Sequence, residues 1–211
     1  MNAEIVFLIC GWVCWCSLHS VLIIPPISAA LRNWLGRDRF YFRLFYNCIA
    51  VLTLVPMVAA TGMMRGPVIF SWSGSWNVIR VMLLCCALYL FHGGSKQYDV
   101  GFFLGIRQIR ERREPATLAA DEQLSRRGVL GMTRHPWYLG SLLFIWTILS
   151  VYHQSSVIAA IVLSLYFVIG TLLEEQKLVA EYGVIYRNYQ HEVSMLIPMK
   201  WLKNRMQRKD R

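Results

Sequence analysis

Charged residues are scarce in this sequence, and acidic residues are the scarcest. Only 16% of the 211 residues are charged, with 12 acidic against 22 basic side chains, whereas 56% are hydrophobic and the mean hydropathy is +0.41. A soluble globular domain of this length normally carries more charge and fewer apolar residues. The composition therefore excludes an ordinary soluble domain and indicates an integral membrane protein.

Cysteines are absent from the polar stretches. All six lie within apolar runs, namely Cys10, Cys14, Cys16, Cys48, Cys85 and Cys86. Disulfides and zinc sites require loops or closed ligand sets, which this placement does not offer. Cys14 and Cys16 lie near His19, but on a helix the two cysteines point about 200° apart. We therefore expect packing roles for the cysteines and no metal site.

The sequence also lacks the marks of a cleaved signal peptide and of a nucleic-acid-binding surface. Glu4 stands where a signal peptide would be basic, and no small-residue cleavage pattern follows the first apolar run. The net charge of +10 lies beside the apolar runs, without the interleaved aromatic residues of RNA-binding motifs. We expect the basic tail, 199–211, to contact anionic membrane lipid and not nucleic acid.

Apolar runs are what the sequence has in abundance, at about 3–24, 44–64, 76–92, 137–152 and 154–173. A helix needs ~20 residues to cross ~30 Å of hydrocarbon, so the fourth run is short. We expect the last two runs to form a tight helical hairpin that turns around Tyr152, His153 and Gln154. The predicted fold is all-α, a polytopic membrane protein with five transmembrane helices and a C-terminal helical hairpin.

Basic residues give the orientation of these predicted spans. Four lie in 32–43, eight in 96–134 and eight from Lys177 onward. Because cytoplasmic loops carry an excess of Lys and Arg, these three zones are expected on the cytoplasmic side. The predicted topology places the N-terminus outside and the C-terminus inside a bacterial inner membrane.

Amphipathic stretches connect several of the apolar runs. The first run ends at Pro25, and residues 27–47 are amphipathic and basic, which is typical of a helix on the membrane surface. Residues 92–115 predict a short interfacial helix or a cap over the membrane region, because an apolar stripe includes Val100, Phe103, Leu104 and Ile106. Residues 114–123 are typical of a polar loop.

The last third of the chain has a helical pattern. Apolar and aromatic residues recur at spacings of three and four from Leu178 to Val193, which predicts a surface helix continuing from the last span. Gly183 interrupts this pattern, and an interior Gly costs about 1 kcal/mol relative to Ala, so we expect either a bend or a close approach by another group there. We expect a single membrane domain, 1–211, with three parts. Residues 1–127 contain three spans and a cytoplasmic loop, residues 128–198 contain the hairpin and the C-terminal helix, and residues 199–211 form the basic tail.

Ionisable residues cluster at two of the predicted helix ends. Arg134 and His135 begin the fourth run, and Glu174 and Glu175 end the fifth. In an antiparallel hairpin both clusters emerge at one membrane level, within reach of each other. Charged groups at the membrane centre cost roughly 2.5–3.5 kcal/mol, so such groups usually have partners and a purpose. Adjacent carboxylates point about 100° apart on a helix, and the pattern does not decide which of the two faces the bundle.

A structural role alone also accounts for each of these clusters. The glutamates can mark the interface through a salt bridge to Arg134 or Lys177. His135 can cap a helix whose first residue is Pro136. These alternatives weaken once Tyr138 and Gly140, which follow in the same stretch, are considered together with the glutamates.

Two motifs resemble a known superfamily. TRHPWYLG at 133–140, a hydrophobic stretch of about thirty residues and EEQKLVAEYGVIYRNY at 174–189 resemble the signature of the isoprenylcysteine carboxyl methyltransferase and phospholipid methyltransferase superfamily. The resemblance covers about 128–198. Upstream pieces are similar to the branch of NnrU proteins, nurim and methanethiol S-methyltransferases, namely LHS at 18–20, RLFYN at 43–47 and FFLGIRQ at 102–108.

The resemblance implies S-adenosylmethionine bound in a cytoplasm-facing cavity, with the acceptor entering from the membrane. It implies Arg134 and His135 at the carboxylate of the cofactor, and Glu174 or Glu175 at its ribose or sulfonium. The implied cofactor-binding set is Gly131, Arg134, His135, Pro136, Tyr138, Gly140, Glu174, Glu175, Tyr186, Arg187 and Tyr189. No GxGxxG motif follows a predicted strand, which excludes a Rossmann-type methyltransferase domain.

The acceptor is less constrained by the residues. Methyl transfer from a sulfonium is an in-line displacement, so the protein mainly positions donor and acceptor. A carboxylate acceptor is already ionised at neutral pH, whereas a thiol, with a pKa near 8.5, needs a nearby cation or base. Arg107 is our first choice for that role, ahead of His92, His19 and His135, although Arg107 can also be one more inside-facing charge.

We therefore predict a membrane methyltransferase acting on a small or lipophilic acceptor, with a thiol favoured over a carboxylate. The predicted catalytic residues are Arg107, His135 and Glu174. The alternative is a non-catalytic membrane scaffold or a small transporter of the NnrU or nurim type. The sequence predicts no particular oligomeric state, because lipid-facing and partner-facing surfaces have similar compositions.

Overall fold

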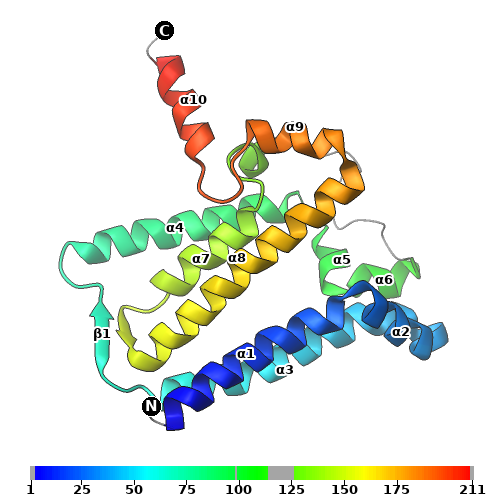
Figure 1. Ribbon diagram of the computed structural model, residues 1–211, viewed down its shortest axis with the longest axis horizontal. Coiled ribbons are helices and arrows are strands. Elements are labelled where there is room, and N and C mark those ends of the chain that lie inside the picture. Colours follow the sequence, from blue (N-terminus) through cyan, green and yellow to red (C-terminus); the bar gives the residue numbers. More distant parts are fainter. Residues whose placement is uncertain (1–2, 98, 114–125, 210–211) are drawn as a thin grey trace. The chain divides into compact units, whose positions relative to one another are not determined.

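The computed structural model describes residues 3–97, 99–113 and 126–209, and the predicted loop at 114–123 lies outside them. The described chain is mostly helical (Figure 1). It forms two compact units, the first from 1–71, 98–119 and 151–163, and the second from 72–97, 120–150 and 164–211. Each unit is built from segments that are separate in the sequence.

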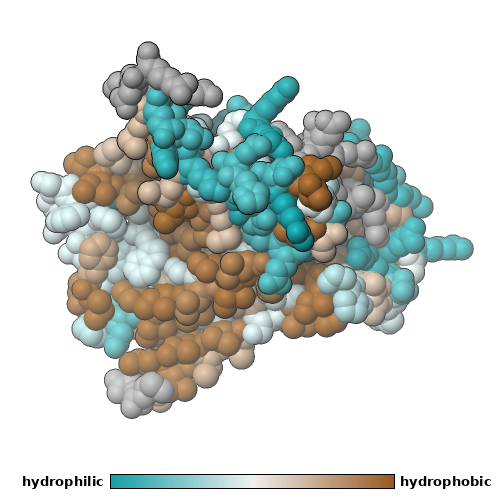
Figure 2. All heavy atoms as spheres, turned by 45° about the horizontal axis from the view of Figure 1, so that its top comes forward, coloured by the Kyte–Doolittle hydropathy of each residue, from teal (hydrophilic) through white to brown (hydrophobic). Residues whose placement is uncertain are grey.

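Long apolar helices make this chain an integral membrane protein. Four helical stretches of the described residues are long and apolar enough to span a membrane: α1 (Ala3–Ile23), Pro25–Met63, α4 (Trp76–Ser95) and α8 (Gln154–Tyr182). The fourth expected span is α7 (Pro136–Thr147), whose 12 residues reach only ~18 Å at ~1.5 Å per residue. The five-span prediction is therefore not confirmed. Figure 2 shows broad apolar areas on the face that it presents.

In the first unit, α1 lies beside α3 (Phe42–Met63), as Figure 1 shows. Leu8 and Trp12 are buried on α1, and the Trp12 indole Nε1 donates to Thr61 Oγ1 over 3.0 Å. A tryptophan buried among apolar helices needs such an acceptor for its N–H group. This pair of helices carries the smaller elements of the unit, which are α2 (Pro25–Leu35), η1 (Gly36–Tyr41), α5 (Val100–Leu104) and α6 (Ile106–Glu111).

The predicted surface segments of the first unit are helical. The α2 helix begins at Pro25, where the missing N–H group costs nothing because the first helical N–H groups have no partner. Gly105 separates α5 from α6 with φ +91°, a conformation that favours glycine. A Cβ atom there would lie 2.6 Å from the backbone nitrogen of Leu44, so Gly105 also allows α5 to approach α3.

Two short strands are the part of the fold that the all-α prediction missed. Antiparallel pairing joins β1 (Val68–Ser71) to β2 (Val151–His153), with Phe70 opposite Tyr152. The Tyr152 side chain is buried and its ring lies 5.8 Å from that of Phe70. Of the three residues expected to form the turn of the hairpin, Tyr152 and His153 are therefore extended, whereas Gln154 begins α8. The apolar pattern alone does not reveal the backbone partners that the two strands supply to each other.

The second unit is organised by close packing of α4 against α7, which lie side by side in Figure 1. Gly140 on α7 meets α4, because a Cβ atom there would lie 3.0 Å from Phe91 Cε1 and 3.3 Å from the carbonyl oxygen of Ala87. The Trp137 indole Nε1 donates to the Phe91 carbonyl over 3.2 Å and lies against Gly94. Small residues on both helices thus set the short distance between them.

The C-terminal part of α8 continues into the surface helix that the pattern predicts. The helix ends at Tyr182, Gly183 has φ +55°, and α9 (Val184–Glu192) follows, so the predicted bend is confirmed. Tyr186, Tyr189 and Val193 are buried and form a small core against α8. The elements that complete the second unit are η2 (Gly128–Gly131) and α10 (Met199–Lys209).

Candidate functional site

The carboxylate of Glu175 is the centre of a buried polar cluster in the second unit. Arg134 donates through Nε to Oε1 at 2.9 Å and through Nη2 to Oε2 at 2.6 Å. Tyr186 donates to Oε1 at 2.5 Å and the amide of Gln190 donates to Oε2 at 2.7 Å. His135 Nε2 lies 2.7 Å from Oε1. The prediction that Arg134 and His135 lie within reach of the two glutamates is therefore confirmed.

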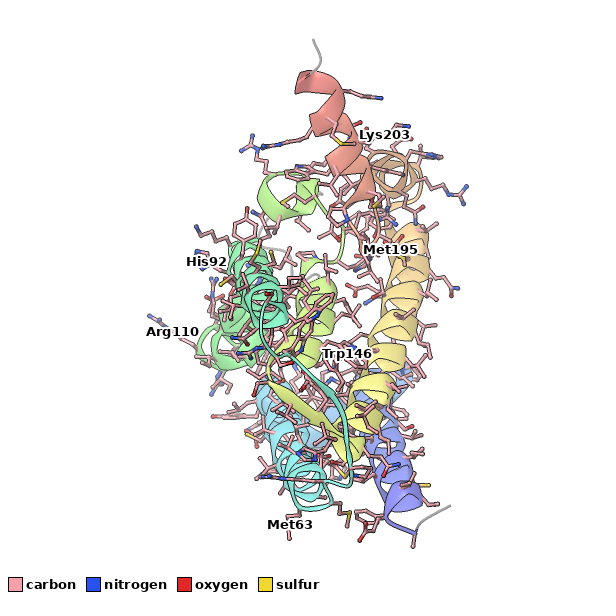
Figure 3. The ribbon with its side chains drawn as sticks, turned by 90° about the vertical axis from the view of Figure 1, so that its left-hand side faces the viewer. Met63, His92, Arg110, Trp146, Met195 and Lys203 are labelled. Carbon is pink, nitrogen blue, oxygen red and sulfur yellow. The ribbon has the colours of Figure 1, made fainter. Side chains whose placement is uncertain are left out.

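Arg134 also holds the segment that follows α9. Its Nη1 group donates to the carbonyl oxygens of Gln190, at 3.2 Å, and of Val193. The backbone of Thr133 to His135 runs beside that segment, with Arg134 N donating to Ser194 O at 3.0 Å and His135 N donating to Met195 O at 3.2 Å. Figure 3 labels Met195 in this segment. One guanidinium thus joins α8, the start of α7 and the end of α9.

The imidazole of His135 has two differently placed nitrogens. An ionised carboxylate only accepts hydrogen bonds, so Nε2 carries the proton in its bond to Glu175. Nδ1 lies 3.8 Å from Oε2 of Glu174, which is longer than a hydrogen bond. The Glu174 side chain is 39% exposed, whereas that of His135 is 3% exposed. Glu174 and His135 Nδ1 therefore lie at the edge of the cluster, while Glu175 lies inside it.

Electrostatics fixes the protonation of the groups around Glu175. Burial and then the hydrogen bond to Glu175 raise the pKa of Tyr186 well above its ordinary value. Burial lowers the pKa of Arg134, but the hydrogen bonds and charge of Glu175 outweigh it and raise that pKa overall. Around neutral pH, Arg134 is therefore charged and Tyr186 is a neutral donor.

An aromatic ring packs against the histidine and contacts a second ring behind it. The Tyr138 ring is edge-on to His135 with centroids 5.7 Å apart, and edge-on to Phe167 at 6.2 Å. Tyr138 also lies against Gly170, where an added Cβ atom would be 3.3 Å from its ring. Trp146, labelled in Figure 3, is on the same helix as Tyr138 and donates to Ser164 on α8. The start of α7 thus offers an apolar wall beside the polar cluster.

The other residues of the predicted cofactor-binding set have various surroundings. Pro136 is buried at the first position of α7, and Gly140 packs against α4 as described above. Tyr189 is buried and donates to the carbonyl oxygen of Leu130 at 2.6 Å. Arg187 is exposed on α9. Gly131 lines an open groove of about 540 Å³ together with Arg126, His191, Glu192, Val193, Lys200, Lys203 and Asn204.

Arg107 belongs to the first unit and is not part of this cluster of the second. Its guanidinium pairs with Asp99 and with Glu111, the latter at 2.8 Å, and lies over the Phe102 ring at 4.8 Å. The two carboxylates already compensate its charge. Its predicted catalytic role stays a prediction.

The three upstream sequence pieces that resemble the superfamily meet inside the first unit. The Tyr46 hydroxyl lies 2.7 Å from His19 Nε2. The Arg43 Nε group and the Asn47 amide both donate to the carbonyl oxygen of Phe103 at 3.1 Å. Side-chain hydrogen bonds thus join the first piece to the second and the second to the third, which gives these polar residues a packing role in this chain.

Sequence reasoning missed two parts of the site. Gln190 supplies a donor to Glu175, but in the pattern it is one more polar residue of a surface helix. Thr133 is fully buried and donates to the carbonyl oxygen of Met195 at 2.8 Å. The hydrogen bonds of Arg134 and Thr133 go to backbone carbonyl oxygens, which every residue has, so no side-chain pattern in the sequence indicates them. The one signal that could have identified Gln190 is its spacing, because a residue one turn after Tyr186 lies on the same face of α9.

Comparison with known proteins places these observations in a family. The family model described as NnrU protein matches residues 7–193. A methanethiol S-methyltransferase of Pseudomonas deceptionensis is 35% identical over 96 residues, which are 44% of this chain and 35% of that protein. A methanethiol S-methyltransferase of Crocosphaera subtropica is 42% identical over 67 residues, 31% of this chain and 25% of that protein.

These alignments are partial on both sides. The chain spans about a third or less of the length of these curated relatives, since the matched part is 35% and 25% of each. No solved structure matches this chain.

Proposed function

Because the chain belongs to the NnrU family, we propose that it is a membrane methyltransferase that uses S-adenosylmethionine and methylates a small or lipophilic acceptor, with a thiol favoured. Relatives that carry the name methanethiol S-methyltransferase support the reaction class and the choice of a thiol. The membrane setting favours an acceptor that partitions into lipid. In the cell, we propose that the site faces the cytoplasm, because the basic zones surround it in the sequence.

One observation carries this proposal. The Glu175 carboxylate is fully engaged by neighbouring donors, and this arrangement holds Glu174 and His135 Nδ1 together at the edge of the cluster, 3.8 Å apart. A buried ion pair with this many hydrogen bonds positions its neighbours firmly. We therefore assign the ligand-binding role to Glu174 and not to Glu175, whose two oxygens already accept five hydrogen bonds.

The available groups fit the proposed cofactor in their chemistry. S-adenosylmethionine supplies a methyl group on a positively charged sulfur. The half-exposed carboxylate of Glu174 suits hydroxyl donors of a ribose or the charge of a sulfonium. Tyr138 supplies an aromatic surface for a planar base.

A thiol acceptor must lose its proton before or during methyl transfer. With Nε2–H donated to Glu175, the neutral imidazole of His135 presents a lone pair at Nδ1. This atom is the proton acceptor that we propose for a thiol. Glu175 orients the imidazole and stabilises its positive charge once the proton has moved, which is the usual role of a carboxylate behind a catalytic histidine.

The proposal is tested with the full chain purified and reconstituted in lipid nanodiscs. The measurement is transfer of a radiolabelled methyl group from S-adenosylmethionine to a small alkyl thiol, to a prenylcysteine and to a phospholipid. We expect the thiol to be labelled, and His135→Gln to lower the rate by about 10²-fold or more, the usual scale for a general base. Glu181→Gln, an exposed carboxylate of the same helix, is the matched control and should not change the rate.

The protein could bind S-adenosylhomocysteine and still transfer no methyl group to any of the three acceptors. That result would contradict the enzymatic proposal and favour a non-catalytic scaffold. Labelling of the prenylcysteine or phospholipid alone would overturn the choice of a thiol.

A further inference from the structure

A second basic feature, in the first unit, has no part in the proposed methyl transfer. An open groove of about 480 Å³ is lined by Gly36, Arg37, Arg39, Phe40 and Arg112. Arg37 and Arg39 come from η1, whereas Arg112 follows α6, more than seventy positions later in the chain. The fold thus brings three guanidinium groups to one groove. We call these three residues the arginine groove.

The three arginines of the groove outnumber the acidic residues beside them in the sequence, Asp38 and Glu111, and Glu111 pairs with Arg107. In the part of the chain that the structure describes, no carboxylate forms an ion pair with Arg37, Arg39 or Arg112. All three side chains belong to exposed residues. Arg39 lies over the ring of Phe40 with 5.1 Å to the centroid, which fixes its guanidinium without neutralising it. Three adjacent cations of one sign attract an anion.

Arg112 caps the C-terminus of α6 in a left-handed backbone conformation. Its φ is +47°, and it is the single residue other than glycine with positive φ among those described. This conformation costs about 1–3 kcal/mol for a residue with a Cβ atom and persists where the surroundings impose it. Glycine would adopt it without this cost, yet the chain has an arginine there.

Exposed aromatic residues that lie close to the groove in the sequence narrow the class of anion that it binds. The helix α2 leads into η1, and Trp34 on it is 83% exposed. Tyr41, at the end of η1, is 49% exposed. Exposed aromatic residues next to basic ones are typical of a surface that lies at the level of lipid headgroups. A free inorganic anion has no apolar part and needs no such aromatic residues.

We propose that Arg37, Arg39 and Arg112 bind the phosphodiester headgroup of an anionic phospholipid, with Trp34 and Tyr41 at the level of its glycerol and acyl chains. Guanidinium groups suit this ligand, because their planar forks donate pairs of hydrogen bonds to phosphate oxygens. The site anchors η1 to anionic lipid. It does not depend on the methyltransferase proposal.

The test uses the full chain, purified in a nonionic detergent, and native mass spectrometry to count bound lipid molecules. Phosphatidylglycerol and phosphatidylcholine with the same acyl chains are titrated separately. We expect phosphatidylglycerol to bind at least about tenfold more tightly, and the loss of each arginine to weaken it about fivefold, from ~1 kcal/mol per basic residue at an anionic surface. Salt should weaken this binding.

The variants are Arg37→Gln, Arg39→Gln and Arg112→Gly. Arg112→Gly is the sharpest of them, because glycine accepts the positive φ and the fold should be kept while the guanidinium is lost. Arg112→Lys should restore part of the affinity. Arg110→Gln is the matched control, since Arg110, labelled in Figure 3, is an exposed arginine of α6 outside the groove.

Equal binding of the two lipids would overturn the proposal, as would an equal loss of phosphatidylglycerol binding in Arg110→Gln. Displacement of the lipid by inorganic phosphate at the same concentration would make the groove a site for free anions and also contradict it. The count of bound lipid is independent of methyl transfer, so failure here and failure of the proposed enzyme are distinguished.

Discussion

Glu174 and Glu175 are adjacent on α8 but have opposite surroundings. The Glu175 side chain is 9% exposed and accepts hydrogen bonds from Arg134, His135, Tyr186 and Gln190, whereas that of Glu174 is 39% exposed and lies 3.8 Å from His135 Nδ1. Neighbouring side chains on a helix point about 100° apart, and this rotation separates the two carboxylates. Substitutions at the two positions should therefore have different consequences.

Glu175→Ala should destabilise the folded protein strongly. Removing the carboxylate leaves the buried Arg134 guanidinium without its partner, which typically costs about 3–5 kcal/mol. The measurement is the free energy of unfolding of the purified protein in detergent, from a denaturant titration. Glu181→Ala on the exposed side of α8 is the control. An unfolding midpoint equal to that of the unaltered protein would show that Glu175 does not hold the cluster together.

Tyr186 should make stability depend on alkaline pH. Its pKa is raised in the folded protein above the ordinary value of 10.0, so the folded state keeps the proton at pH values where the unfolded chain has lost it. This contribution to stability is complete below pH 10 and decreases as the pH rises above it. Tyr186→Phe should remove this dependence, and should cost about 1.5–3 kcal/mol at neutral pH, where a hydrogen bond to a charged group is lost.

Melting temperatures of the unaltered protein and of Tyr186→Phe, measured from pH 7 to pH 11, test this. The difference between the two should shrink above pH 10. A constant difference across the range would contradict the account.

Gly140→Val should destabilise the packing of α7 on α4. An added Cβ atom would already lie 3.0 Å from Phe91 Cε1 and 3.3 Å from the Ala87 carbonyl oxygen, and the methyl groups of valine have less room still. Overpacking of this kind costs about 1–3 kcal/mol. Gly62→Val is the control, because a Cβ atom at Gly62 would meet no atom within 4 Å outside the neighbouring backbone of its own helix. If Gly140→Val lowers cofactor affinity without lowering the unfolding free energy, Gly140 contacts the cofactor and not mainly the neighbouring helix.

Arg107→Gln should lower the rate of thiol methylation if the guanidinium acts on the thiol. Its ion pairs with Asp99 and Glu111 lie at the exposed surface, where such pairs contribute little to stability, so the variant should fold. We expect at least a tenfold decrease in kcat/KM for the thiol, with unchanged affinity for S-adenosylhomocysteine. Arg110→Gln is the control for charge alone. Equal rates in the two variants would remove Arg107 from the catalytic residues.

The sequence could predict the parts of the site that depend on helical periodicity. The aromatic spacing from Leu178 to Val193 indicates a helix with one buried face, and the position of Gly183 indicates its bend; both are found. The convergence of Arg134 with the glutamates follows from two adjacent antiparallel helices. Each of these rests on repeating geometry that the side chains themselves encode.

The rest depends on contacts that leave no side-chain pattern. Pairing of β1 with β2 joins residues that are eighty or more positions apart. At the end of α9, carbonyl oxygens accept the hydrogen bonds of Arg134. The choice between Glu174 and Glu175 depends on the rotation of α8 about its axis, which a run of apolar residues on all sides does not fix. The short α7 was expected to be longer because apolar residues continue beyond Thr147 into β2.

The central claim is that Glu175 supports the site while Glu174 contacts the cofactor. Calorimetry with S-adenosylhomocysteine tests it most directly, on the unaltered protein, on Glu174→Gln and on the control Glu181→Gln, all three checked for equal melting temperatures. The account predicts micromolar-range or tighter binding that Glu174→Gln weakens at least about tenfold, equivalent to ~1.4 kcal/mol, while Glu181→Gln binds as the unaltered protein does. Equal affinity in Glu174→Gln and the unaltered protein would contradict the account.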